Sequence, residues 1–327
     1  MNNIVPNFLK RRYLLNALIV VFMTVLLPAC EDVYALAHKV KVRLSALIQS
    51  NEADAPSAVI PMVSGVKIIK DVAYGDHKKQ SMDIYVPENV SSAPIILMLH
   101  GGGWSSGDKG DALIYINKVN RWVPKGFIVI SMGTRLMPDA DVYTQIGDLS
   151  RAVATVQKRA AEWGGDTDKL MLMGHSSAGT MVSVLAANPS LVTDLGGKRW
   201  LASFSLDSSS LDIPRTMRLW QPEMFSYAYG KDSKKWPAAS PINLLNSQSI
   251  PLFIACSTQR GDGPCEQAAL FVEQAKKFNI TTKITEQNFN HGEVNDRLGT
   301  DGEYTNTAEA FMASLDVEVA ARLNVEK

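Results

Sequence analysis

Two adjacent serines with small neighbours are candidate nucleophiles, in residues 174–179, which read Gly-His-Ser-Ser-Ala-Gly. A serine hydroxyl attacks a carbonyl carbon where a sharp strand-to-helix turn exposes it and a base takes its proton, and that turn needs small residues two positions before and after the serine. With Ser177 as the nucleophile, the imidazole of His175 would clash with a neighbouring strand. With Ser176, only the methyl group of Ala178 intrudes. Ser176 is therefore the preferred nucleophile, and a serine-rich helix cap is the alternative.

A run of three glycines could supply the next part of this chemistry, the stabilisation of negative charge. Residues 100–104 read His-Gly-Gly-Gly-Trp and follow an apolar stretch. Backbone amides fixed in such a loop meet the oxygen that becomes negative during acyl transfer, contributing about 3 kcal/mol per donor, and glycine leaves the approach open. Gly102 and Gly103 are the predicted donors, with the amide of Ser177 opposite them. A merely flexible turn is the alternative.

The base is found by elimination among five histidines. Four fall at positions that a base would not occupy, in the N-terminal region, a hairpin turn, the glycine loop and the serine turn itself, at His38, His77, His100 and His175. His291 remains, in a glycine-containing loop after the last predicted strand that can bring the ring back to the serine. A lone structural histidine is the alternative to this assignment.

An acid must orient the imidazole and stabilise its cation, and it should lie between nucleophile and base in the chain. Asp262 follows the seventh predicted strand and is preferred. Asp207, at the end of the sixth predicted strand, is the rival, and Glu266 is a distant third.

These loops need a scaffold that brings them together, and eight β-rich runs recur from Gly65 onward, at residues 66–74, 81–87, 94–100, 126–132, 169–174, 200–206, 250–257 and 281–288. The first two form a hairpin, because their connection is too short for a parallel crossover. Later runs such as 95–99 are apolar on both faces, as strands covered by helices on either side must be. Residues 145–163 have the apolar spacing of a helix that stops at Gly164 and Gly165. We predict an α/β fold with an eight-stranded, mostly parallel sheet and helices on both faces.

In such a sheet, ligands bind at the carboxyl ends of the strands. The glycine loop, the serine turn, the Asp262 loop and His291 each follow a predicted strand. Residues 208–249 are rich in aromatic side chains and have no clear strand, so they form either a small cap over the site or packing at the sheet edge.

Composition limits the function classes. The 327 residues include 46% hydrophobic and 20% charged residues, with 33 basic and 33 acidic side chains. This is typical of a globular protein, and the balanced charge argues against nucleic acid as the main partner. No Cys or His cluster has zinc-ligand spacing. No metal is therefore predicted.

The N-terminal residues predict export. Residues 1–29 combine a basic stub with a largely apolar run and read as a secretory signal, and Cys30 follows directly, as in a bacterial lipobox. An uncleaved membrane anchor and simple secretion are the alternatives. Removing residues 1–29 would leave 30 basic against 33 acidic residues, a formal charge of −3. Residues 30–62 would then hold an amphipathic helix and a tether, and residues 63–327 the catalytic domain, anchored in the cell envelope or periplasm through lipid on Cys30.

Two cysteines remain after Cys30 is assigned to lipid. In an oxidising compartment, Cys256 and Cys265 are allowed to pair as a disulfide. The bond would stiffen the loop that carries Asp262, and two separate buried thiols are the alternative.

The combination of HGGGW at 100–104, Asp-Thr-Asp at 166–168, Gly-His-Ser at 174–176 and the late His291 resembles the α/β-hydrolase superfamily, and within it bacterial carboxylesterases that are feruloyl-esterase-like or hormone-sensitive-lipase-like. The resemblance runs from about residue 65 to residue 315. It implies the α/β-hydrolase fold, hydrolysis of small-molecule esters through a Ser-Asp-His triad and an acyl-enzyme, and no cofactor.

Other readings of the same resemblance stay open. The glycine motif is also similar to that of arylformamidases, which would make the protein an amidase for N-formyl aromatic amines. A catalytically idle hydrolase fold that serves as a surface binding module is a third reading. The sequence departs from the family pattern at Ala178, where glycine is usual, at residues 133–136, and in the spacing of the Asp262 loop.

Overall fold

The computed structural model describes residues 60–219 and 223–325. The predictions for the export signal, for Cys30 and for the amphipathic helix that follows it lie outside the described residues. The unit that holds the sheet runs from Met62 to Lys327. Within the described ranges, no helix is both long and apolar enough to cross a membrane.

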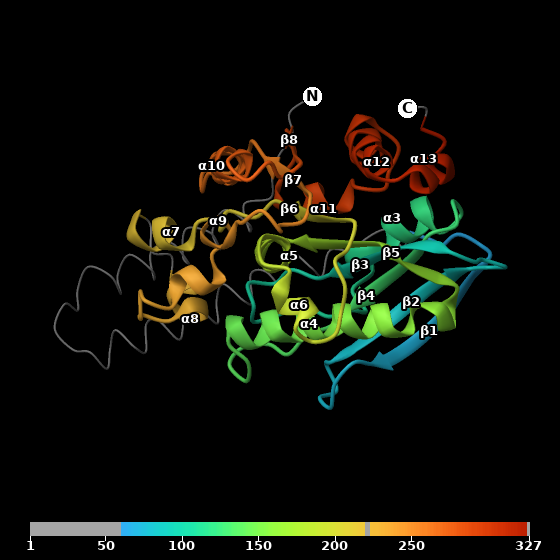
Figure 1. The fold of residues 1–327 in the computed structure, drawn as a ribbon, viewed down its shortest axis with the longest axis horizontal. Helices are drawn as coiled ribbons and strands as arrows, with labels where there is room; N and C mark the ends of the chain where they lie inside the picture. The colour runs from blue at the N-terminus through green and yellow to red at the C-terminus, as the bar shows by residue number, and fades with distance from the viewer. Residues whose placement is uncertain (1–59, 220–222, 326–327) are drawn as a thin grey trace, which may run out of the picture. The chain divides into compact units, whose positions relative to one another are not determined.

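One eight-stranded sheet forms the centre of this unit (Figure 1). Its strands are β1 Val66–Ala73, β2 Ser81–Pro87, β3 Ala93–Leu99, β4 Ile128–Met132, β5 Gly165–His175, β6 Ala202–Leu206, β7 Leu252–Ser257 and β8 Thr282–Gln287, in the order β1-β2-β4-β3-β5-β6-β7-β8. β1 and β2 form the predicted antiparallel hairpin, β2 also runs antiparallel to β4, and the remaining pairs are parallel. The predicted α/β sheet is confirmed.

Helices cover both faces of the sheet, and alternate residues of a central strand show why. In β3, Ile95, Leu97 and Leu99 face one apolar cluster, whereas Ile96 and Met98 face the other. The first cluster is completed by α4 Val142–Arg159, α5 Ser177–Ala187 and α10 Pro264–Lys276; the second is completed by α3 Ala112–Trp122, α12 Glu303–Leu315 and α13 Val317–Leu323. A strand buried on both sides must be apolar at every position, which is the pattern that the sequence has there.

The predicted helix at residues 145–163 corresponds to α4, which begins three residues earlier, and a short 3₁₀ turn, η1 Ala160–Trp163. The Asp141 side chain caps the α4 start by accepting from the amide of Thr144. Gly164 ends the turn with φ 78°, and a Cβ there would lie 2.5 Å from the carbonyl oxygen of Val90. Gly165 does not prolong this stop but starts β5, because it pairs with Ala93 ahead of a register shift in β3.

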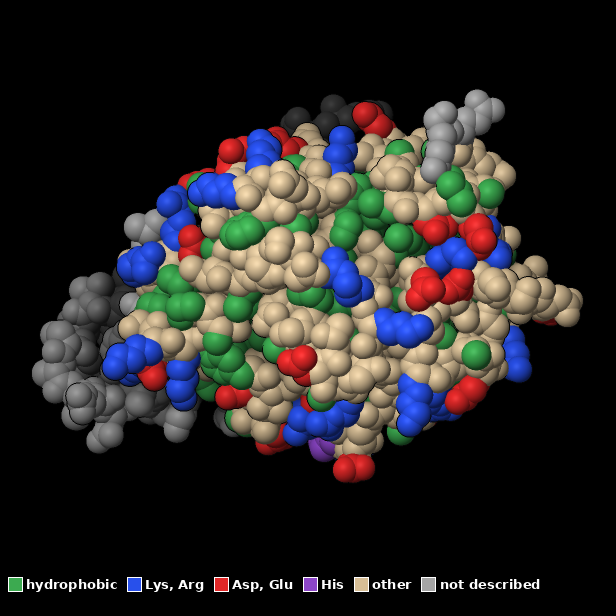
Figure 2. Space-filling model, in the orientation of Figure 1, with side chains coloured by type: hydrophobic (Ala, Val, Ile, Leu, Met, Phe, Trp, Pro, Cys, Tyr) green, Lys and Arg blue, Asp and Glu red, His purple; other side chains and the backbone are tan. Residues whose placement is uncertain are grey.

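Short helices make up the aromatic segment, with no strand among its described residues. They are α7 Ile213–Leu219, α8 Glu223–Tyr229, η2 Trp236–Ala239 and α9 Pro241–Leu244. Two further short helices, α6 Ser190–Thr193 and α11 His291–Asp296, follow α5 and β8 in the chain. On the face drawn in Figure 2, basic and acidic side chains are interspersed and do not gather into a patch of one sign.

Candidate active site

Ser176 occupies a strained turn between β5 and α5. Its backbone angles, φ 58° and ψ −122°, are sparsely populated by residues other than glycine, and such strain is stored mainly at functional sites. The Ser176 amide donates to the carbonyl oxygen of Leu206 at 2.8 Å, which ties the turn to β6. A Cβ on Gly174 would lie only 2.4 Å from the carbonyl oxygen of Ala178. The backbone at Gly174 thus passes close to the backbone at Ala178, two residues on either side of Ser176, as predicted for a turn that exposes Ser176. Ser177 is already the first residue of α5.

His291 contacts this serine from a position 115 residues further along the chain. The Ser176 hydroxyl lies 2.9 Å from His291 Nε2. His291 is the first residue of α11, which follows β8, and Asn290 and Glu293 fix the helix start by a reciprocal capping box. The His291 side chain is 40% exposed, so solvent and a ligand can reach it. The predicted nucleophile and the predicted base therefore lie together.

The ring of His175, the residue before Ser176, holds the backbone of His291 by a hydrogen bond. His175 Nε2 lies 2.8 Å from the backbone oxygen of His291, and the two ring centres are 4.5 Å apart. Because a carbonyl oxygen can only accept, Nε2 of His175 must carry the proton. Burial, with a smaller contribution from His291, lowers the pKa of His175 to about 3. His175 is thus neutral near pH 7 and holds the backbone of His291 rather than exchanging protons.

The structure contradicts the predicted contact between Asp262 and His291. His291 Nδ1 lies 2.6 Å from Oδ2 of Asp207, the carboxylate that we ranked second. Asp207 follows β6, the strand beside β5, and its left-handed backbone with φ 55° sends the carboxylate toward the imidazole. Asp262 instead folds back onto Arg260, two residues earlier, and accepts from both its Nε and its Nη2. Asp262 is thus paired with a permanent cation, and its predicted contact with His291 is not formed.

Asp207 is fully buried and well supplied with donors. Its other oxygen, Oδ1, accepts from the amide of Ser257 at 2.7 Å, and Arg260 Nη1 lies 2.9 Å from Oδ2. Burial alone would raise the pKa of Asp207, but the hydrogen bonds and the Arg260 charge outweigh burial and hold that pKa below its usual value. Asp207 therefore remains ionised beside His291 near pH 7.

The glycine loop lies directly against the serine. A Cβ on Gly101 would come within 3.1 Å of Ser176 Cβ, so glycine permits this approach. Gly102 and Gly103 have φ values of 122° and 58°, which glycine adopts without strain. The loop end is fixed by the backbone oxygen of Trp104, which accepts from the side chain of Gln145 at 2.8 Å. The oxyanion role predicted for the amides of Gly102, Gly103 and Ser177 stays a prediction.

The aromatic segment packs on this loop. The Trp104 ring meets the rings of Phe225 and Tyr229 edge-on, with ring centres 5.4 and 5.2 Å away. A Cβ on Gly103 would lie 2.7 Å from the sulfur of Met224. Trp104, Phe225 and Tyr229 also belong to the larger apolar cluster, the one that α4, α5 and α10 complete, whereas Met224 is exposed. The segment thus both covers the glycine loop and packs as core, and the two alternatives that we considered are not exclusive.

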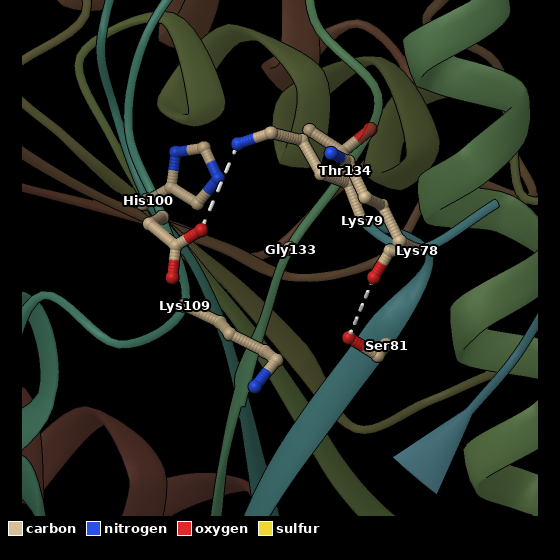
Figure 3. A pocket seen from close by; sticks show the side chains of 8 residues that line it. Lys78, Lys79, Ser81, His100, Lys109, Gly133 and Thr134 are labelled. Carbon is tan, nitrogen blue, oxygen red and sulfur yellow. Dashed lines mark hydrogen bonds and ion pairs between the residues drawn. The ribbon is translucent and has the colours of Figure 1, made fainter. Parts of the chain in front are cut away.

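A small polar cavity of about 40 Å³ lies behind the glycine loop (Figure 3). Its lining includes Lys79, Lys109 and His100, and none of Ser176, Asp207 and His291. Nδ1 of His100 lies 2.7 Å from the backbone oxygen of Gly101, so this cavity backs the loop rather than opening beside the serine. Among the described residues, no group of three His, Cys, Asp or Glu side chains is placed to hold a metal ion.

Cys256 and Cys265 form a disulfide, with Cα atoms 5.2 Å apart. The bond joins the end of β7 to the first turn of α10 and encloses the loop that carries Arg260 and Asp262. The predicted pairing is present, and the loop that it closes holds Arg260, which contacts Asp207.

In comparisons with known proteins, this chain is similar to several esterases. Residues 82–198 match the family model BD-FAE. A probable isoprenylcysteine alpha-carbonyl methylesterase of Arabidopsis thaliana is 28% identical over 109 residues, which is 33% of this chain and 22% of that relative. Carboxylesterase NlhH of Mycobacterium tuberculosis is 33% identical over 117 residues, 35% of this chain and 34% of that relative. The chain thus spans only about a quarter to a third of the length of these relatives.

The crystal structure of esterase B from Lactobacillus rhamnosis superposes with a TM-score of 0.68 over 90% of this chain and 98% of that protein, at 17% identity. At this identity the superposition concerns the fold alone, and the fold is the one that the sequence resemblance implied.

Proposed function

We propose that this chain, which has the α/β-hydrolase fold, is a serine hydrolase that cleaves small carboxylic esters through an acyl-enzyme. One observation carries the proposal: the Ser176 hydroxyl lies 2.9 Å from His291 Nε2, and His291 Nδ1 lies 2.6 Å from Asp207. A hydroxyl, an imidazole and a buried carboxylate in this chain of contacts make up the machinery that activates a serine for acyl transfer.

In the proposed reaction, Ser176 Oγ bonds to the ester carbonyl carbon while its proton moves to His291 Nε2. The carbonyl oxygen becomes negative, and the amides of Gly102, Gly103 and Ser177 donate to it. The bond to the alcohol oxygen then breaks as His291 returns the proton to it, which leaves Ser176 acylated. Water then attacks the acyl carbon while one of its protons moves to His291 Nε2. The bond to Ser176 Oγ breaks as His291 returns that proton to Oγ, and the carboxylic acid departs.

Asp207 keeps His291 in the tautomer that this sequence requires. While Nδ1 donates to Asp207, Nε2 is free of a proton and can accept one from Ser176. The ionised carboxylate also stabilises the imidazolium that forms during attack. In this proposal Asp262 has no contact with the reacting groups.

The exposed Met224 supports an apolar substituent on the ester. Its side chain is close to Gly103 and 49% exposed, so it offers apolar surface beside the glycine loop.

The decisive experiment labels the protein with a fluorophosphonate probe, which reacts with an activated serine. The wild-type chain and the Ser177→Ala variant should label, whereas Ser176→Ala should not. Loss of label in Ser177→Ala alone would show that the other serine is the nucleophile. Absence of label in the wild-type chain would favour the idle binding module over the enzyme.

A second measurement separates esterase from arylformamidase activity. The proposal expects nitrophenyl acyl esters to be hydrolysed with a higher kcat/KM than formyl-anilides. The opposite order would make the protein an amidase that uses the same side chains.

We also propose that the chain is exported and anchored through lipid on Cys30, because residues 1–29 combine a basic stub with an apolar run before that cysteine. Cells that express the full chain are grown with radiolabelled palmitate. The wild-type protein should incorporate the label, and the Cys30→Ser variant should not. Equal labelling of the two would refute the anchor.

A further inference from the structure

Arg260 is a largely buried cation that the proposed reaction does not use. Its Nη1 lies 2.9 Å from Oδ2 of Asp207 and 2.9 Å from Nδ1 of His291, and it also donates to the backbone oxygen of Asp207 at 2.7 Å. A permanent positive charge thus touches both members of the pair that holds the reacting imidazole in place.

We propose that Arg260 and Asp262 act together as a positioning pair that sets the charge around Asp207 and His291, and thereby the pH range in which the hydrolase works. This inference rests on the proposed function and assigns a role to Asp262, whose carboxylate contacts Arg260 instead of His291.

Two groups compete for one oxygen of the Asp207 carboxylate. Oδ2 of Asp207 accepts from both His291 Nδ1 and Arg260 Nη1. When His291 takes the serine proton and becomes a cation, it faces the guanidinium at contact distance. A like charge this close opposes formation of the charged imidazole.

Asp262 offsets that effect. It accepts from Nε of Arg260 at 2.8 Å and from Nη2 with its second oxygen, so the carboxylate and the guanidinium pair side by side. Asp207, Arg260 and Asp262 together carry one net negative charge, the same as an isolated carboxylate beside a histidine. Removal of Arg260 would raise this to two negative charges, and neutralisation of Asp262 would reduce it to zero.

The other groups around His291 are the same in every variant of this pair. His175 from β5 is neutral, and Ser209 accepts from Arg260 Nη2 at 3.3 Å. The charged or titratable groups further out are Lys118 of α3, Glu293 and Asp296 of α11, and Tyr304 of α12. None of these is altered by substitution at residues 260 or 262, so a change in pH dependence can be assigned to the pair.

The disulfide explains how a short loop can hold this geometry. Cys256 and Cys265 close the loop at both ends, and Arg260 and Asp262 lie between them. The guanidinium is therefore fixed from three sides, by Asp207, by Asp262 and by a covalently closed backbone.

The test is the pH profile of kcat/KM for a nitrophenyl ester, measured on the wild type, Arg260→Gln, Asp262→Asn and the double variant. The acid limb reports loss of the neutral base. Arg260→Gln should move this limb to higher pH and Asp262→Asn to lower pH, each by about half a pH unit or more. The double variant, with one negative charge again, should lie near the wild type.

Two controls keep the result specific. Arg260→Lys retains the charge and should keep the limb near its wild-type position. Arg215 pairs with Glu266 at the start of α10 and has no contact with Asp207, so Arg215→Gln should leave the profile unchanged. A thermal melt by circular dichroism establishes that each variant is folded. If Arg260→Gln does not fold, Asp262→Asn and Arg260→Lys decide the question.

If Arg260 and Asp262 had a purely structural role, their substitution would lower kcat. It would not move the acid limb of the pH profile in opposite directions in the two single variants. Shifts of the same sign in both single variants, or no shift in either, would therefore overturn the inference while leaving the proposed function intact. Absence of esterase activity and of fluorophosphonate labelling in the wild type would refute the function, and the inference with it.

Discussion

At the scale of residues, Asp207 is our proposed acid because of its contact with His291. Asp207 and Asp262 both follow strands at the same edge of the sheet, and chain order alone allows either. Arg260 pairs with both carboxylates, but only Asp207 also contacts Nδ1 of His291, at 2.6 Å. The sequence did contain a signal: an arginine two residues before Asp262 is an obvious partner for that carboxylate.

The first prediction tests this assignment. Asp207→Asn should lower kcat by about 10³-fold or more, because an amide no longer fixes the tautomer of His291 or stabilises its cation. Asp262→Asn should retain most of kcat at pH 8, because its contact is with Arg260. Steady-state kinetics on both variants gives the comparison, and a larger loss in Asp262→Asn would restore that residue as the acid.

At the scale of elements, the strands and the serine turn could be predicted, and the aromatic segment could not. Strands such as β3 are continuous apolar runs because both of their faces are buried, and this pattern is visible without coordinates. The serine turn has its own signature in small residues at fixed spacing. The helices between residues 208 and 249 are short, and their position depends on contacts with Trp104 that are distant in the chain.

The second prediction concerns the crossing of backbone at the serine turn. Gly174→Ala should destabilise the fold by about 1–3 kcal/mol and reduce labelling of Ser176, because the new methyl group meets the Ala178 carbonyl. Gly147→Ala is the matched control: it lies in α4 with open space around it, and should stabilise by about 0.5–1 kcal/mol. Urea unfolding of both variants measures the difference, and equal effects would contradict this account of the turn.

At the scale of the whole molecule, the matched family region and the candidate site coincide only in part. Residues 82–198 contain the glycine loop and Ser176, but Asp207 and His291 lie beyond them. Similarity therefore supports the first half of the site, and the second half depends on how the sheet brings β6 and β8 to the same edge as β5. Long-range pairing of this kind cannot be deduced from residue spacing.

A buried lysine connects α3, which lies within the matched family region, to α11, which lies beyond it. This lysine gives the third prediction. Lys118 of α3 is fully buried and donates to the side-chain oxygen of Asn295 in α11, the helix that begins with His291. Desolvation lowers the pKa of Lys118 from 10.5 to about 7, with Asp296 acting in the opposite direction. Between these two values the unfolded chain holds a proton that the folded chain lacks, so folded-state stability is lost as pH falls from about 10 toward 7.

Stability should therefore rise between pH 7 and 9, by up to about 1.4 kcal/mol per pH unit from this group. Lys118→Met keeps the volume and removes the titration, so its free energy of unfolding should vary less over the same range. Urea unfolding at several pH values compares the two proteins. Parallel curves for wild type and Lys118→Met would show that this lysine does not cause the slope.

The distance in sequence between Ser176 and His291 also has a consequence for synthesis. A ribosome adds Ser176 115 residues before it adds His291, the base in our proposal. If that proposal holds, Ser176 is inactive in the nascent chain until β8 and His291 have been made and have docked. If the finished chain acts outside the cytoplasm, as we propose, an unfinished one would be harmless to ester-containing metabolites on the way there.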